Sequence, residues 1–384
     1  MPDERAPLPA GFPHGFFGAG SVDDHVLLLR CLQGITPYAL RTLAWETGSA
    51  AAALHAIREA HAGSDGDRAF LAGADAAEVR RRLGAVGARF AVPGEPEYWP
   101  AFLRLADPPV GVFLRGQPLG LGGDHVAIVG SRRPSALGKD VAKQLARGLA
   151  ACGVVVISGG AIGIDAVAHR GALEAGGRTI AVLGAGIDVP YPAASAQLFR
   201  EIRAAGTLLG EYPPGLPAEP YRFPARNRLI AALSRGVVVV EGAARSGTRI
   251  TATHALELGL EVFALPGPVT SPLAETPLEL IRDGATLIRG PEDLLTDLGL
   301  DRGVAAPRTG PIGLPADEQR VYDAIDGPLL PDAVARRTDL PIGVAVGVLI
   351  RLELRGLVRG VGGRYERTFE GLAPARSGEE RGAG

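Results

Sequence analysis

Cysteine is scarce in this sequence, with only Cys31 and Cys152 among 384 residues. The two are far apart and match no metal-binding or redox spacing, so a disulfide-stapled secreted domain and a zinc finger are excluded. We expect both to be reduced thiols in a cytoplasmic protein. Apolar runs of the ~18–20 residues that cross a bilayer are also missing, and the first residues lack the basic start and apolar core of a signal peptide. No membrane association is expected.

Net charge is close to zero, at −2, so overall charge gives no support for nucleic-acid binding. Lysine is nearly absent: 38 of the 40 basic residues are arginine, which compositional bias alone explains. Any phosphate contact is therefore expected to use arginine. Between residues 221 and 250 the balance shifts, because one acid, Glu241, is accompanied by six arginines, at positions 222, 226, 228, 235, 245 and 249.

The N-terminal part is expected to be helical. The length suggests two or three domains. Residues 1–20 are rich in Pro and Gly and predict a flexible tail. Residues 21–90 predict helices, one of them starting with Thr36 as N-cap and Pro37 in the first turn. Such a helical unit could clamp a DNA backbone or bind proteins, and we favour the second. Residues 91–119 predict a connector whose aromatic side chains pack onto a neighbouring domain, namely Tyr98, Trp99 and Phe102.

Residues 120–298 alternate short apolar runs with helical segments. Continuous apolar strands that alternate with helices are typical of a parallel sheet covered on both faces. The pattern predicts an α/β domain with a doubly wound, Rossmann-like parallel sheet. The six expected strands are residues 126–129, 154–157, 179–183, 208–209, 237–240 and 262–265, and the clearest helices are 138–151, 165–175 and 248–258.

The C-terminal part predicts a second small domain. Residues 299–314 indicate a linker, residues 315–370 three helices and a hairpin typical of a winged helix, and residues 371–384 a disordered tail. In the third helix, residues 342–355, the stretch 342–350 is almost wholly apolar and Arg351, Glu353 and Arg355 lie only near its end, whereas a helix that reads DNA presents polar and basic side chains. We therefore expect this domain to make protein contacts, or to modulate the central domain, and to add little DNA affinity.

Three strands end in small-residue loops that lead into helices. In an open parallel sheet, ligands bind at the carboxyl ends of the strands. Small residues let backbone N–H groups approach an anion, and the helix dipole favours its charge. The loops predict a phosphate-type ligand, with these candidate residues: Gly130, Ser131, Arg132, Ser158, Gly159, Gly160, Glu241, Gly242, Ser246, Gly247 and Thr248.

Two missing motifs and one unusual segment indicate which class of phosphate-containing ligand the loops bind. Neither GxGxxG nor GxxxxGK[ST] follows a strand, so a dinucleotide cofactor and P-loop chemistry are not expected. The segment from Phe223 to Arg228 offers a ring that can stack on a base, two arginines for successive phosphates, and an amide for sugar or backbone: Phe223, Arg226, Asn227 and Arg228. This combination is typical of single-strand binding. Taken alone, the segment fits equally well with a solvated arginine pair beside a buried Phe223.

Asp165 and His169 lie four residues apart on one helical face. Such a pair can perform acid–base work, but it is more often structural. We favour the structural role, with Asp165 capping the helix and His169 hydrogen-bonded to it. No catalytic residue, metal or cofactor is expected, because no nucleophile elbow or metal-ligand spacing occurs.

Taken together, the central motifs resemble the DprA/Smf family of DNA-processing proteins. The family pattern runs VGSR, SGxARGID followed by AH, TIAVLGxG, YP, FPxRNRxI, SGxLITA and VFAxPG. The matching segments are 129–132, 158–165 with 168–169, 179–186, 191–192, 223–230, 246–252 and 262–267. Three positions depart from it: Ile162 stands where the family has arginine, Arg249 where it has an apolar residue, and a usual lysine is missing near residues 275–277.

The resemblance implies a homodimeric, non-enzymatic protein that binds single-stranded DNA. It further implies protection of incoming single strands and help in loading the recombinase RecA during natural transformation and homologous recombination. It relates the N-terminal helices to SAM or helix–hairpin–helix domains and the C-terminal segment to a winged helix. The main alternative is a nucleotide phosphoribohydrolase of the lysine-decarboxylase-like fold, whose PGGxGTxxE loop is broken here between Glu241 and Thr248. A protein-only scaffold is the third reading.

Overall fold

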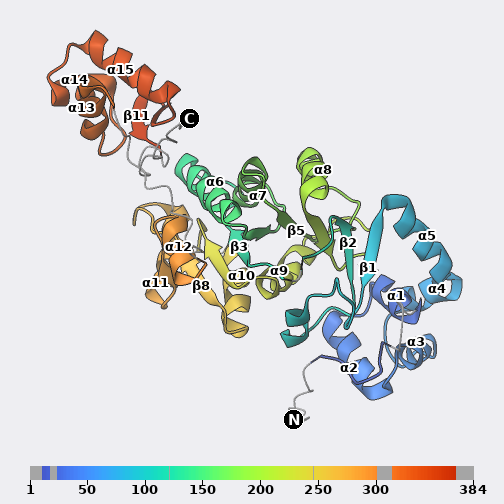
Figure 1. The fold of residues 1–384 in the computed structure, drawn as a ribbon. Helices are drawn as coiled ribbons and strands as arrows, with labels where there is room; N and C mark the ends of the chain where they lie inside the picture. The colour runs from blue at the N-terminus through green and yellow to red at the C-terminus, as the bar shows by residue number, and fades with distance from the viewer. Residues whose placement is uncertain (1–10, 18–23, 121, 245, 301–313, 369–384) are drawn as a thin grey trace, which may run out of the picture.

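The computed structural model describes residues 11–17, 24–120, 122–244, 246–300 and 314–368 (Figure 1). At its centre is one sheet, and six of its strands coincide with the six apolar runs of the sequence. These are β3 (His125–Val129), β4 (Val155–Ser158), β5 (Thr179–Leu183), β6 (Thr207–Gly210), β7 (Gly236–Val239) and β8 (Glu261–Ala264). They pair in parallel, and the short β9 (Thr286–Leu287) adds to β8 in the same sense. The predicted doubly wound α/β fold is confirmed.

Segments expected outside this domain extend the sheet at its β6 side. β2 (Val112–Gly116) pairs antiparallel with β6, and β1 (Ala88–Ala91) pairs antiparallel with β2. Residues 91–119, expected to be a connector, thus carry a strand of the sheet as well as the 3-10 helix η1 (Pro100–Arg104). The strand was not predicted because its run of large apolar residues is short, residues 112–114, and lies between prolines. All three residues are fully buried. Of the aromatic side chains expected to pack, Tyr98 and Phe102 are buried with ring centroids 5.4 Å apart, and Trp99 stacks on His125 of β3 at 4.6 Å.

The strand order creates a crevice at one place in the sheet. The full order is β1-β2-β6-β5-β4-β3-β7-β8-β9. From β3 the chain steps outward through β4, β5 and β6, and then returns to β7, which pairs with β3 on its other side. The connections that leave β3 and β7 therefore run to opposite sides. A ligand crevice is expected at the carboxyl ends of these two strands.

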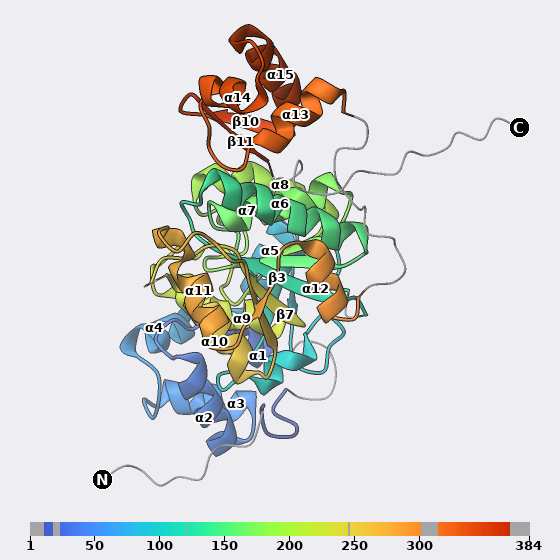
Figure 2. The same cartoon turned by 90° about the vertical axis from the view of Figure 1, so that its left-hand side faces the viewer.

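Two helical layers cover the sheet (Figure 2). One layer contains α6 (Ala136–Ala151), α7 (Ile164–Glu174) and α8 (Ala196–Ala205), with α12 (Pro291–Asp297) packed beside α6. The other contains α9 (Arg222–Ala232), α10 (Gly247–Glu257) and α11 (Glu275–Arg282), which is preceded by η3 (Pro272–Ala274). Side chains of the central strands are buried on both faces of the sheet, which explains why these strands are continuous apolar runs in the sequence.

The N-terminal part is helical, as the sequence predicts. Its helices are α1 (Asp24–Cys31), α2 (Pro37–Thr47), α3 (Ala50–Arg58), α4 (Asp65–Gly73) and α5 (Ala76–Val86). Thr36 caps α2, and its hydroxyl accepts a hydrogen bond from the N–H of Ala39. The described part of the expected flexible tail, residues 11–17, packs instead: Phe16 is 1% exposed and lies 5.6 Å from Phe12, ring to ring. Burying aromatic rings offsets the Pro/Gly-rich composition there.

The C-terminal domain is the predicted winged helix. It contains α13 (Ala316–Ala324), α14 (Pro331–Thr338), α15 (Ile342–Leu354) and a hairpin of β10 (Val358–Val361) and β11 (Arg364–Arg367). Arg359 of β10 forms an ion pair with Asp140 of α6. Most of the expected linker and the expected C-terminal tail lie outside the described residues. Within the described ranges, no helix combines the length and apolarity that a membrane crossing requires.

Candidate functional site

An open cleft of about 580 Å³ lies at the crevice between the ends of β3 and β7. Its walls come from the loops after these two strands, the start of α9 and the start of α10. The sequence-predicted residues that line it are Gly130, Ser131, Arg132, Asp165, Phe223, Arg226, Asn227, Ser246, Gly247 and Thr248. Segments up to about 120 residues apart in the chain therefore meet in one cleft, as the alternation of strands and loops predicts.

The β3–α6 loop is held against the start of α7 by glycine. Gly163 has a φ of 88°, and a Cβ at this position would lie 2.3 Å from the carbonyl oxygen of Ser131. The close approach lets the N–H of Ile164 donate to that same oxygen, at 3.1 Å. The loop is thus fixed, and Arg132 extends from it with its side chain exposed.

Arg132 faces two aromatic rings in this cleft. Its guanidinium carbon lies 5.6 Å from the ring centroid of Phe223, and that ring lies 5.1 Å from the ring of Tyr191. Tyr191 is half exposed, at 50%. No ion pair ties Arg132 to a carboxylate of the described residues, so its charge is available to an anion. A free cation beside two accessible rings can hold a phosphate and stack a base.

The start of α10 supplies backbone donors to the same cleft. Ser246 is the N-cap, but its side chain makes no cap hydrogen bond and instead lies 3.4 Å from the hydroxyl of Thr276. The first N–H groups of a helix have no partner within the helix. Gly247 and Thr248 line the cleft, and Asn227 donates its side-chain N–H to the carbonyl oxygen of Gly247, at 3.2 Å. Asn227 therefore also positions this helix start.

Arg226 lines the cleft but is largely committed to the protein. It is 4% exposed, and its guanidinium donates to the carbonyl oxygens of Gly159 and Val182 and, at 3.0 Å, to Asn227. Burial lowers the pKa of Arg226 to about 10, while nearby Asp165 acts in the opposite direction. A Cβ on Gly159 would lie 2.2 Å from this guanidinium, so the glycine makes room for the arginine rather than for a phosphate.

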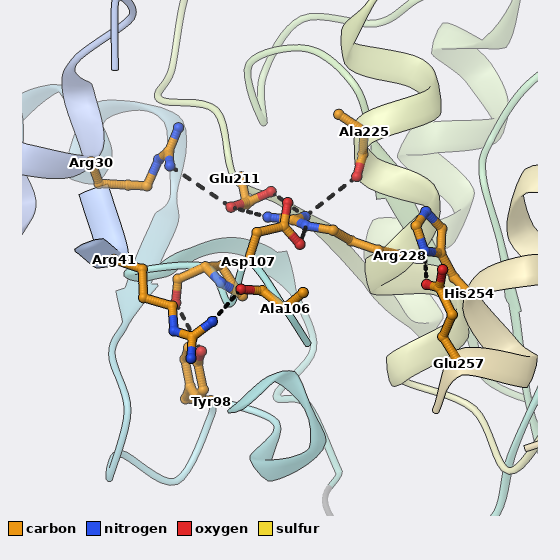
Figure 3. A network of polar contacts seen from close by, with 11 residues as sticks. Arg30, Arg41, Tyr98, Ala106, Asp107, Glu211, Ala225, Arg228, His254 and Glu257 are labelled. Atoms are coloured by element: carbon orange, nitrogen blue, oxygen red, sulfur yellow. Dashed lines mark hydrogen bonds and ion pairs between the residues drawn. The ribbon is translucent and has the colours of Figure 1, made fainter. Parts of the chain in front are cut away.

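Arg228 does not line the cleft. It lies in a network of polar contacts with Glu211 and Asp107 (Figure 3). It is 3% exposed and forms two hydrogen bonds with Glu211, at 2.6 and 3.0 Å, and an ion pair with Asp107 at 2.9 Å. Arg30 of α1 lies 3.7 Å from the same Glu211 carboxylate. Burial opposes ionisation of Glu211, yet Arg228 lowers the pKa of this carboxyl below its usual value. The expectation that Arg226 and Arg228 grip successive phosphates finds no support in this geometry.

The other arginines of the basic segment are also engaged. Arg222 donates to the carbonyl oxygen of Pro217, Arg235 pairs with Asp124, and Arg249 pairs with Glu279 of α11. Arg245 lies outside the described residues. Arg249, which stands where the family motif has an apolar residue, is thus exposed and paired with an acid. The number of arginines in this segment therefore does not indicate the charge of the cleft, because the acids that neutralise them come from distant segments.

Several predicted site residues support the framework instead of lining the 580 Å³ cleft. Glu241 accepts hydrogen bonds from the backbone N–H and hydroxyl of Ser135, the N-cap of α6. Its carboxylate thus occupies the helix start at which an anion was expected to bind. Ser158 is fully buried and donates to the carbonyl oxygen of Ile128. Gly160 lies against Phe199, and Gly242 donates its N–H to the carbonyl oxygen of Leu273.

Asp165 and His169 each make a hydrogen bond within the protein, but not with each other. Asp165 accepts a hydrogen bond from the N–H of Ala161 near the start of α7, at 3.3 Å. The His169 ring pairs through Nδ1 with the hydroxyl of Thr179, at 2.7 Å, and not with Asp165. The Thr179 hydroxyl donates to Val156, so Nδ1 of His169 carries the proton. Complete burial lowers the pKa of His169 to about 3, so the ring stays neutral and is unsuited to acid–base work.

Tyr191 is the residue that sequence reasoning did not place in the site. It belongs to the Tyr-Pro pair quoted for the family, and it follows the strand β5 at the carboxyl edge of the sheet. That position was the available signal. A smaller adjoining cavity of about 100 Å³ shares Arg132, Tyr191 and Phe223 with the cleft. Ile162, which replaces the family arginine, lines this cavity and is 46% exposed, so the wall is apolar there.

Comparison with known proteins connects this geometry to one family. Residues 89–299 match the model of DNA recombination-mediator protein A, and residues 305–364 match the DprA winged helix domain. The first match alone spans more than half of the chain. The chain belongs to the DNA recombination-mediator protein A family.

Members of this family resemble the chain over most of its length. Protein Smf of Escherichia coli is 39% identical over 289 residues, covering 72% of this chain and 76% of that protein. DNA processing protein DprA of Bacillus subtilis is 40% identical over 209 residues, covering 54% and 70%. The crystal structure of DNA processing protein A from Streptococcus pneumoniae superposes with a TM-score of 0.53 at 32% identity, covering 69% of this chain and 99% of that one.

Proposed function

We propose that this protein binds single-stranded DNA in the cleft at the ends of β3 and β7. One observation carries the proposal: Arg132, the rings of Tyr191 and Phe223 and the start of α10 all face one open cleft. Among the described residues, no carboxylate pairs with Arg132, and no side chain caps α10. Cation and backbone N–H groups suit phosphates, and exposed rings suit bases whose faces are free. Base faces are free in a single strand and stacked in a duplex, so single strands are favoured.

We further infer that the protein is a recombination mediator without catalytic activity. Family membership supports a role in protecting incoming single strands and in loading RecA during natural transformation and homologous recombination. It also supports a homodimer acting in the cytoplasm. The phosphoribohydrolase alternative has little support, because the Glu241 carboxylate is held by Ser135 and the neutral His169 lies outside the cleft.

Replacing Arg132 with alanine is expected to weaken oligo-dT binding by about 10- to 100-fold. A charged hydrogen bond to a phosphate is worth roughly 1.5–3 kcal/mol, and about 1.4 kcal/mol is a factor of ten. Fluorescence-anisotropy titrations at several salt concentrations measure both affinity and its salt dependence. The log–log salt slope should decrease by about 0.7 for each phosphate contact that is lost.

Arg133→Ala is the matched control for this titration. Arg133 is the exposed neighbour of Arg132 on the same loop, but it does not line the cleft. A smaller loss for Arg133→Ala supports the cleft as the binding site. Equal losses for the two variants would indicate general electrostatic attraction, and an unchanged affinity of Arg132→Ala would place DNA elsewhere.

Removal of the winged helix is expected to change oligo-dT affinity by less than tenfold. In a winged helix α15 would enter a groove. Arg351 of α15 and Arg355, which directly follows this helix, both pair with the buried carboxylate of Glu318, at 2.9 and 2.8 Å. Exposed apolar side chains occupy much of the remaining surface of α15, including Ile342, Val344, Ile350 and Leu354. The measurement compares the full chain with a variant that ends at Leu300, after circular dichroism has shown that both are folded. A loss beyond tenfold would make the winged helix a principal DNA site.

A further inference from the structure

Three arginines gather on the α8 side of the sheet, away from the basic segment of the sequence. Arg115 lies on β2, and Arg200 and Arg203 lie on α8, which packs against β2 (Figure 1). All three line a cavity of about 140 Å³. The sequence gives no sign of this cluster, because its members are up to 88 residues apart and β2 was not expected to be a strand.

Arg115 and Arg203 form no ion pair with an acid in the part of the chain that the structure describes. Nε of Arg115 is buried without a hydrogen-bond partner, and no ion pair joins either guanidinium to a carboxylate within the described residues. Burial lowers the pKa of Arg115, and the charge of Arg203 lowers it further, so the two cations repel each other. Asp188 lines the same cavity and partly offsets them, but its carboxylate accepts a hydrogen bond from the N–H of Gly215, at 2.7 Å. One acid against three arginines leaves the cavity positive.

An anion in this cavity would offset the repulsion between Arg115 and Arg203 and would lie near the buried Nε of Arg115. A desolvated cation without a partner destabilises the fold, and like charges in proximity add to that cost. Arg200 at the rim is exposed and hydrogen-bonded to Gln197, so it can turn toward an incoming group. A phosphate group would supply acceptors for several guanidinium N–H groups at once.

The arginine-lined cavity is related to the cleft through the smaller cavity that lies beside both. The 580 Å³ cleft and the 100 Å³ cavity share Arg132, Tyr191 and Phe223. The 100 Å³ cavity and the arginine-lined cavity in turn share Val189 and Phe199. A strand that follows these shared residues would run from Arg132, past the aromatic rings and the apolar wall, to Arg115 and Arg203.

We propose that Arg115, Arg200 and Arg203 form a second phosphate site, which holds the backbone of the bound single strand as it leaves the aromatic cleft. The proposal rests on the proposed function, because it assigns to the same strand an exit path across α8. Bases would occupy the aromatic part of the path, and the arginine-lined part would contact only phosphate. Its contribution therefore depends on oligonucleotide length and is independent of sequence.

The test compares Arg115→Gln and Arg203→Gln with the unaltered full chain on two oligo-dT lengths, about six and about twenty nucleotides. We expect each variant to lose about three- to tenfold in affinity for the longer strand and little for the shorter one. Arg170→Gln is the matched control, because Arg170 is an exposed arginine on the neighbouring helix α7 that does not line the cavity. Thermal unfolding should be unchanged or shifted upward in both variants, because an unpartnered cation is removed.

A second experiment tests whether the phosphates bound by the three arginines belong to the DNA backbone. In the longer strand, methylphosphonate linkages remove backbone charge on one flank at a time. On the flank that crosses α8, this change should weaken binding to the unaltered chain but not to Arg203→Gln. Equal methylphosphonate effects in both proteins, or equal losses on both strand lengths, would overturn the second site. Failure of the unaltered chain to bind either strand would instead overturn the proposed function itself.

Discussion

Arg228→Met is expected to lower the free energy of unfolding by about 3–5 kcal/mol, the range for breaking a buried ion pair by removing one partner. The reason is that Glu211 and Arg228 are each nearly inaccessible, and the variant leaves the Glu211 carboxylate with only Arg30, at 3.7 Å. Urea denaturation followed by circular dichroism measures the change. DNA affinity per folded molecule should remain near that of the unaltered chain, because Arg228 lies outside the cleft.

Arg249→Met is the control for this experiment. It removes an arginine from an ion pair whose partners are 44% and 43% exposed, and exposed pairs contribute about 0–1 kcal/mol. Similar losses of unfolding free energy for the two variants would show that the buried ion pairs contribute no more to stability than an exposed pair. Loss of DNA affinity by Arg228→Met in a folded protein would instead restore the role that the sequence suggested for this arginine.

Acidification from pH 6.5 to pH 4.5 is expected to destabilise the protein by about 2–3 kcal/mol through His169 alone. Burial lowers the pKa of His169 to about 3, against 6.5 in the unfolded chain. Between these two values the unfolded state binds the proton and the folded state does not, so stability falls by about 1.4 kcal/mol per pH unit. Above pH 6.5 both states are neutral and the effect vanishes.

His169→Asn isolates this contribution. An asparagine can keep a hydrogen bond to the Thr179 hydroxyl but does not titrate. Denaturation curves at pH 7.5, 6.5, 5.5 and 4.5 should show a shallower decline for the variant. A residual decline is expected, because burial also lowers the pKa of His125. Identical pH slopes for the variant and the unaltered chain would mean that His169 is not the group whose protonation matters.

The sequence predicted the framework well because its signals are local. Six apolar runs that alternate with helical segments, three of them followed by small-residue loops, were enough to place the six central strands and the crevice at their ends. β2 was missed because a strand of five residues between prolines has the composition of a loop. Its place in the sheet depends on pairing with β6, 90 or more residues later in the chain, which no local pattern shows.

The site was only partly predictable, because it too depends on pairing between segments that are distant in the sequence. Gly130, Arg132, Phe223 and Thr248 reach the cleft because strand ends and helix starts fix their positions. Which arginines stay free depends on partners elsewhere: Glu211 and Asp107 neutralise Arg228, whereas Arg132 and Arg115 have no acid partner among the described residues. Charge counted along the sequence could not separate these cases, because burial and pairing are properties of the folded chain.

The two edge strands of the central sheet affect how the protein behaves at high local concentration. An open parallel sheet normally presents two strand edges that another copy can extend by hydrogen bonding. Here one edge is the two-residue β9, and the other is the four-residue β1, where Arg89 pairs with Glu97 at 2.6 Å. Short, charged edges resist such extension. Copies held side by side at high local concentration are therefore protected against edge-to-edge aggregation.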